Sequence, residues 1–164
     1  MKPLRTCVLA ASILTLTGDP SIRMVAPVQA AETPFAGRAS YLNSPQAKKL
    51  GLPFSEAVRA GGLLFLAGQI GNVPGESGLI AGGITAESRQ AMRNVQQVLE
   101  RYGSALRDVI KCTVFLADMS EWSQFNSVYR EFFQAPYPAR SAVGVNGLAF
   151  NARVEIECIA YVAN

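Results

Sequence analysis

The sequence has no histidine among its 164 residues, and this absence removes several kinds of chemistry. A Ser-His-Asp triad and a Cys-His pair both need an imidazole as their base. Protein zinc sites are usually built from histidine or clustered cysteine, and the three cysteines here have no zinc-type spacing. The sequence therefore predicts an activity that uses neither these nucleophiles nor a bound metal.

Charge is also scarce. Charged residues make up 16% of the chain and hydrophobic residues 49%, a balance typical of a globular protein, and the length suits one domain. Without residues 1–30 the net charge falls from +3 to +1, because three basic residues and one acidic residue are removed. No cluster of lysine and arginine remains, so we expect no nucleic-acid partner.

The N-terminal residues 1–30 resemble a secretory signal peptide. Lys2 and Arg5 precede an apolar stretch, residues 8–17, that is too short to span a bilayer stably. Small residues then stand at 28 and 30, where a signal peptidase would cut. We expect a periplasmic or secreted protein without stable membrane association. The alternative is a disordered or mis-started N-terminus.

The rest of the chain divides into an extension, residues 31–52, which is expected to be loop-like, and a domain, residues 53–164. Apolar residues recur at helical spacing in two segments, and β-branched runs or period-two alternation indicate strands elsewhere. The link Gly61–Gly62 predicts a hairpin, and Thr85 is the expected cap of the first helix. The expected strands are 55–60, 63–69, 109–117, 141–146 and 153–162, and the expected helices are 85–102 and 121–134.

This order predicts an α+β domain. The first two and the last two strands are expected to form hairpins of a mainly antiparallel sheet, with both helices packed on one face. Cys112 and Cys158 lie in apolar strand-like runs and are expected to be buried thiols rather than a disulfide.

The last strand alternates cleanly and places two carboxylates, those of Glu155 and Glu157, on the face that no helix covers. They stand about 7 Å apart, which permits general acid/base work through a water. Two other interpretations remain open: an ordinary solvated face, or a face that packs against other subunits.

Arg140 follows two prolines that stiffen the approach to a strand, Pro136 and Pro138. A guanidinium on a rigid support can bind a carboxylate with two parallel hydrogen bonds, so we expect a small carboxylate ligand here. The alternative is an ordinary surface arginine.

Five ordered motifs then resemble the Rid (reactive intermediate deaminase) family, also called YjgF or L-PSP. They are Pro53-Phe54-Ser55, Gly68-Gln69-Ile70, Asn126 with Tyr129, Tyr137-Pro138-Ala139-Arg140-Ser141, and Val154-Glu155-Ile156-Glu157. The resemblance implies a chorismate-mutase-like α+β fold and a homotrimer with a central β-barrel. It also implies deamination of 2-imino acids and their enamine tautomers to 2-keto acids and ammonia, with no cofactor.

The resemblance also implies roles for individual residues. Arg140 would hold the substrate carboxylate, Asn126 would orient Arg140, and Glu157 would hold or activate the attacking water. Gly68 would let the backbone approach the ligand closely.

Four positions depart from the family pattern. Phe54 and Ala67 replace a tyrosine and a serine, so two hydroxyls of the substrate-binding set are lost. Ala142 replaces a cysteine two places after the arginine, and Ala149 replaces a proline in the last turn.

Alternatives to a deaminase are a non-catalytic protein that binds a keto acid in the same cleft and a chaperone-like protein of the same fold. Ribonuclease activity, attributed to relatives, is disfavoured by the near-neutral charge.

Overall fold

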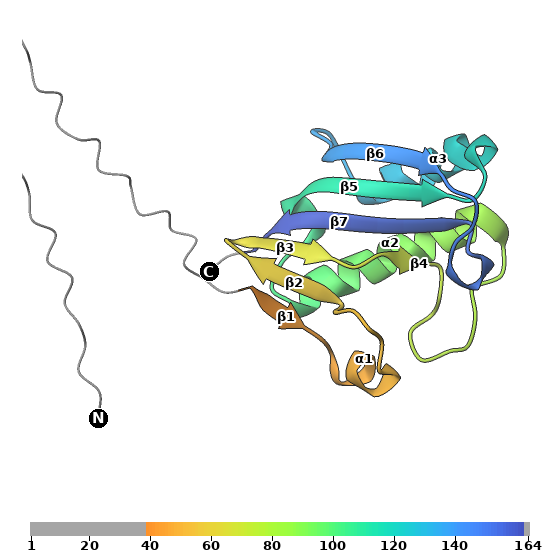
Figure 1. The fold of residues 1–164 in the computed structure, drawn as a ribbon. Coiled ribbons are helices and arrows are strands. Elements are labelled where there is room, and N and C mark those ends of the chain that lie inside the picture. Colours follow the sequence, from red (N-terminus) through yellow and green to blue (C-terminus); the bar gives the residue numbers. More distant parts are fainter. Residues whose placement is uncertain (1–38, 163–164) are drawn as a thin grey trace, which may run out of the picture. The chain divides into compact units, whose positions relative to one another are not determined.

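The computed structural model describes residues 39–162, which form one sheet with two long helices against one of its faces (Figure 1). The strands are β1 (Ser40–Leu42), β2 (Ala57–Ala60), β3 (Leu63–Leu66), β4 (Gln69–Ile70), β5 (Val109–Leu116), β6 (Ala139–Gly144) and β7 (Val154–Tyr161). The helices are α1 (Pro45–Leu50), α2 (Gly83–Arg101) and α3 (Trp122–Phe132). Three short 3-10 turns complete the set: η1 (Leu106–Asp108), η2 (Met119–Glu121) and η3 (Ala149–Asn151).

The sheet runs in the order β1-β2-β3-β7-β5-β6, and β4 also pairs with β7. All pairs are antiparallel except β5–β6, so the expected α+β fold with a mainly antiparallel sheet is confirmed. The expected final hairpin is wrong, because β6 pairs with β5 and the last strand lies between β3 and β5. The physical reason is that α3 makes a crossover between β5 and β6, and a crossover delivers the next strand in parallel.

The helices bury one stripe each against the sheet, as their spacing predicted. Met92, Val95 and Leu99 of α2 and Phe125 of α3 are fully buried in the common core. The expected cap Thr85 is wrong, since α2 begins at Gly83 after an N-cap at Gly82. Both glycines have positive φ, which turns the chain into the helix two residues earlier.

The extension up to residue 52 is not all loop, which corrects the prediction. β1 adds to the sheet beside β2, and α1 begins where the Ser44 hydroxyl accepts a hydrogen bond of 3.1 Å from the backbone N–H of Ala47. The Glu56 carboxylate then ties this segment to the end of α2. It accepts hydrogen bonds from the Ser44 backbone N–H at 2.7 Å and from the Tyr102 hydroxyl at 2.6 Å. The predicted signal peptide lies outside the described residues.

Cys112 and Cys158 form a disulfide, so the prediction of two free thiols is wrong. They are direct register partners on β5 and β7, and both side chains are buried on the helix-covered face. The alternation of each strand predicted their burial. Their pairing depends on β7 lying beside β5. The sequence analysis expected the last strand to pair with β6 instead, so it did not predict that the two cysteines are adjacent.

Within residues 39–162, no helix is long and apolar enough to cross a membrane, and no group of three or more histidine, cysteine and acidic side chains could hold a metal ion.

Candidate functional site

Arg140 stands near the start of β6, the edge strand that follows the turn containing Pro136 and Pro138. Its side chain is half-buried and turns toward α3, where its Nη2 donates a hydrogen bond of 2.6 Å to Oδ1 of Asn126. The resemblance implied this pairing, and the structure brings the two side chains together. The Asn126 oxygen occupies one donor and leaves others of the guanidinium for a ligand.

The guanidinium also lies over two aromatic rings of α3. Its carbon is 4.6 Å from the centre of the Tyr129 ring and 5.5 Å from that of Phe125. These rings are buried and belong to a contiguous series, since Tyr129 also packs against Phe133 with centroids 4.7 Å apart. Burial raises the pKa of Tyr129 to about 12, partly offset by the positive charge of Arg140. A neutral ring beneath the cation and an amide at its edge fix the charge in one orientation.

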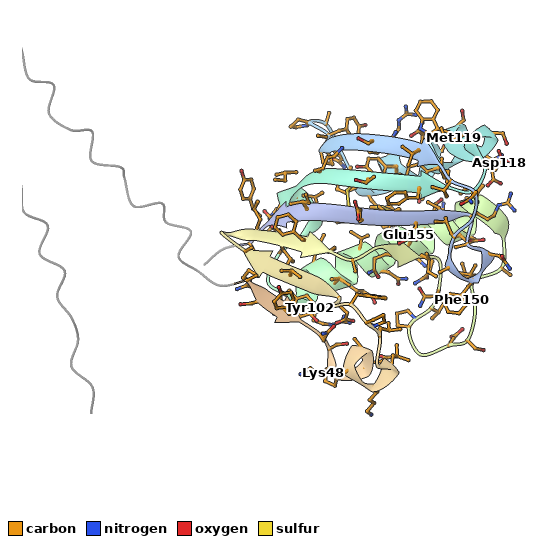
Figure 2. All side chains as sticks on the ribbon, viewed as in Figure 1. Lys48, Tyr102, Asp118, Met119, Phe150 and Glu155 are labelled. Atoms are coloured by element: carbon orange, nitrogen blue, oxygen red, sulfur yellow. A yellow bond between two sulfur atoms is a disulfide. The ribbon has the colours of Figure 1, made fainter. Side chains whose placement is uncertain are left out.

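Glu155, the second residue of β7, lies on the uncovered face against the backbone of Gly68 (Figure 2). A Cβ atom at Gly68 would overlap the Glu155 carboxylate, with its carboxyl carbon only 2.7 Å away. Burial, followed by the nearby charge of Glu157, raises the pKa of Glu155 above its ordinary value. The absence of a side chain at Gly68 therefore leaves the space that the Glu155 carboxylate occupies.

Glu157 is more exposed and lies beside Thr113 of β5. It borders a hollow of about 150 Å³ on the same face. The hollow is lined by residues of β3, β5 and β7, and Lys111 brings an ammonium to it: Phe65, Leu66, Lys111, Thr113, Cys158 and Ile159. The two carboxylates thus have different surroundings, and Glu155 is the more enclosed.

Arg140 and the two carboxylates lie on opposite faces of the sheet within one chain. Arg140 reaches α3 on the covered face, whereas Glu155 and Glu157 alternate with the buried Ile156 and point the other way. A single chain therefore does not present all three groups to one small ligand.

The other predicted site residues are distributed in the same way. Ala142 is half-buried and packs against the core two residues after Arg140, on the face of β6 that Arg140 occupies. Ala67 directly precedes Gly68, and its N–H donates to the Glu56 carbonyl at 3.0 Å. Phe54 is exposed in the segment before β2. Ala142 thus accompanies Arg140, and Ala67 accompanies Gly68 and Glu155.

Two features of the site were not assigned from sequence. Tyr129 was named only as part of a family motif, but its spacing of one helical turn from Phe125 also predicts a shared aromatic surface beneath a cation. Glu155 was one of a pair, and only its contact with Gly68 separates it from Glu157.

Comparison with known proteins places this arrangement in a family. A family model described as Endoribonuclease L-PSP matches residues 44–162. The chain belongs to this family, also called Rid or YjgF. The resemblance found in the sequence motifs is thereby confirmed.

Several relatives of this Rid-family protein are known. A protein of the mite Dermatophagoides farinae, named 2-iminobutanoate/2-iminopropanoate deaminase, is 42% identical over 110 residues, which is 67% of this chain and 86% of the relative. A RutC family protein of Pyrococcus horikoshii is 44% identical over 109 residues, 66% of this chain and 86% of the relative. The crystal structure of a Rid-family protein of unknown function from Yersinia pestis superposes with a TM-score of 0.71 at 33% identity, covering 76% of this chain and all of that one.

Proposed function

We propose that this Rid-family protein hydrolyses 2-imino acids and their 2-amino-enamine tautomers to 2-keto acids and ammonia, with the substrate carboxylate held by Arg140. The observation that carries the proposal is the oriented guanidinium, fixed by Asn126 and the Tyr129 ring with donors left for a ligand. The name of the mite relative, 2-iminobutanoate/2-iminopropanoate deaminase, supports the same reaction class.

We further propose that the chain acts as a homotrimer with its sites between subunits. Two observations support this. The groups needed for one site lie on opposite faces of a single sheet, so a second chain must supply one of them. The uncovered face also carries exposed apolar side chains spread across the sheet, namely Tyr41 of β1 at 74% exposure, Phe65 of β3, Tyr161 of β7 at 60% and Val143 of β6. Packing this face against other subunits would form the central barrel that the family resemblance implies.

For the acid/base role, the geometry favours Glu155 over the expected Glu157. A carboxyl group transfers protons best when its pKa lies near the working pH, and burial moves the pKa of Glu155 in that direction. The contact with Gly68 also holds its carboxylate in place, whereas Glu157 stands in a more open position. Glu157 then contributes negative charge beside it.

The proposed reaction begins when a water oxygen attacks the carbon of the protonated imine and Glu155 accepts one proton of that water. The product of this step is a tetrahedral carbinolamine. Glu155 returns the proton to nitrogen, the C–N bond breaks with its electron pair on nitrogen, and the hydroxyl proton leaves with the departing ammonia as ammonium. The protonated imine is already electrophilic, so the protein need only position it and supply one proton acceptor.

We also propose that the protein works outside the cytoplasm, as its N-terminal sequence predicts. The Cys112–Cys158 disulfide supports this location, because structural disulfides persist mainly in oxidising compartments.

The test follows the hydrolysis of imino acids that an amino-acid oxidase makes in situ. We expect the wild-type protein to accelerate imine loss and ammonia release, and Arg140→Ala to abolish the acceleration. Glu155→Gln should remove most of the rate, whereas Glu157→Gln, its matched neighbour two residues away, should retain more of it. Keto-acid binding without accelerated ammonia release would instead favour a non-catalytic binding protein.

A further inference from the structure

Phe150 is a large apolar side chain placed in an unusual way. Among the exposed large hydrophobic residues of the described chain it is the most exposed, at 79%. Its backbone is left-handed, with φ 58° and ψ 20°, and the next residue, Asn151, also has a positive φ of 60°. Non-glycine residues in this region are strained, and an exposed phenyl ring gains nothing from burial to offset that strain.

The turn that carries Phe150 is nevertheless firmly anchored. Within η3, the backbone N–H of Asn151 donates to the Leu148 carbonyl at 3.1 Å. Ala152 is buried immediately after it. The Arg153 N–H then donates to the buried Glu87 carboxylate at 2.8 Å. The ring is thus held outward by a defined backbone and does not project from a loose loop.

The same anchored segment leads directly into the candidate site. The Arg153 side chain is bound to Glu121, with Nε donating to Oε1 at 2.9 Å, and Glu155 follows two residues later. Phe150 and Glu155 lie at the same end of the sheet, away from Tyr102 at the other end (Figure 2). The turn therefore fixes the backbone position of Phe150 at the end of the sheet that carries Glu155.

The remaining candidate residues are apolar. Phe54 and Ala67 carry no hydroxyl, and Phe54 presents a second exposed ring. Asn126 is engaged with Arg140 and Gly68 has no side chain, so apart from these, Arg140 and the acidic pair, the predicted set offers a substrate side chain only a ring and methyl groups: Phe54, Ala67 and Ala142. Such a surface favours an apolar side chain over a polar one.

We propose that Phe150 determines specificity by contacting the side chain of the substrate, and that the preferred 2-imino acids carry an aromatic or large apolar side chain. This inference rests on the proposed deaminase function and names the substrate class of that same site. A ring carried outward on an anchored backbone is suited to stack on another ring, because little backbone freedom is lost on contact.

The experiment compares imines made in situ from alanine and from phenylalanine by an amino-acid oxidase. The measured quantity is the ratio of kcat/KM for the phenyl-bearing imine to that for the methyl-bearing imine, in the wild type, Phe150→Leu and Phe150→Ala. We expect the wild-type ratio to exceed one. It should fall about tenfold in Phe150→Ala, the size expected for losing an aromatic pair and its burial, and less in Phe150→Leu. Light scattering on each variant reports the oligomeric state.

Three results would overturn the inference. The ratio could be unchanged in Phe150→Ala, the wild type could prefer the methyl-bearing imine, or Phe150→Ala could dissociate the oligomer, which would make the ring a subunit contact. If the wild type accelerates no imine, the proposed function fails on its own. Calorimetric affinities for phenylpyruvate and pyruvate then decide the role of Phe150 by the same ratio.

Discussion

The disulfide between Cys112 and Cys158 is expected to stabilise the domain substantially. It closes a loop with a sequence separation of 46 residues between two adjacent strands. Loop-closure entropy in the unfolded chain assigns about 4 kcal/mol to a loop of this length. For a domain of intermediate size, that corresponds to a decrease in Tm of roughly 10 to 20 °C on reduction.

The assay is thermal unfolding of the wild type with and without reductant, at one protein concentration because an oligomer's Tm depends on concentration. The matched control is the double variant Cys112→Ala, Cys158→Ala, whose Tm should be low and insensitive to reductant. Comparison with the reduced wild type separates the lost cross-link from the void that the two alanines leave.

Thiol counting decides whether the premise holds. In the full chain, prepared with residues 1–30 retained, there are three cysteines, so denaturation without reductant should expose one reactive thiol, that of Cys7, and reduction should expose three. Three reactive thiols before reduction, or an unchanged Tm in a sample shown to be fully reduced, would refute the reasoning.

Two further predictions concern the site. Asn126→Ala removes a hydrogen bond to a charged and half-exposed guanidinium, so we expect substrate binding to weaken by about 1 kcal/mol. This corresponds to a roughly fivefold rise in KM with a smaller change in kcat. A roughly fivefold fall in kcat with an unchanged KM would contradict a positioning role. Glu155→Gln should raise the free energy of unfolding, measured with urea, relative to the wild type more at pH 7 than at pH 4. Because the pKa of Glu155 is raised in the folded state, its favourable contribution is present below the ordinary value of 4.5 and is lost as the pH rises through the raised value. A difference between variant and wild type that does not change with pH would exclude this linkage.

The parts of the fold that could be predicted from sequence are those governed by local periodicity. The apolar spacing in α2 and α3 and the alternation in β7 identified these elements and their buried faces. The short elements β1 and α1 were missed, because a three-residue strand and a six-residue helix carry too few positions for a period to show. Strand order was partly missed because pairing depends on crossovers, which local spacing does not encode.

The site shows the same division. The proline-flanked Arg140 could be singled out from sequence, and its partner Asn126 followed from the family motifs. The sequence could not decide whether Glu155 or Glu157 takes the acid/base role, because both side chains point to the same face of β7. Only Glu155 contacts the backbone of Gly68, which lies between β3 and β4. The disulfide was missed for the related reason that β5 and β7 are 46 residues apart at the bonded pair.

The central place of β7 has a consequence for biosynthesis. Among the strands of residues 39–162, β7 comes last in the sequence, yet it joins β3 on one side to β5 on the other. A growing chain that has reached β6 therefore holds two separate half-sheets, each with an open edge, and cannot complete its hydrogen-bond ladder until β7 has been synthesised. Until then, each open edge can pair with a strand of another chain, so this stage of synthesis is the one most exposed to aggregation.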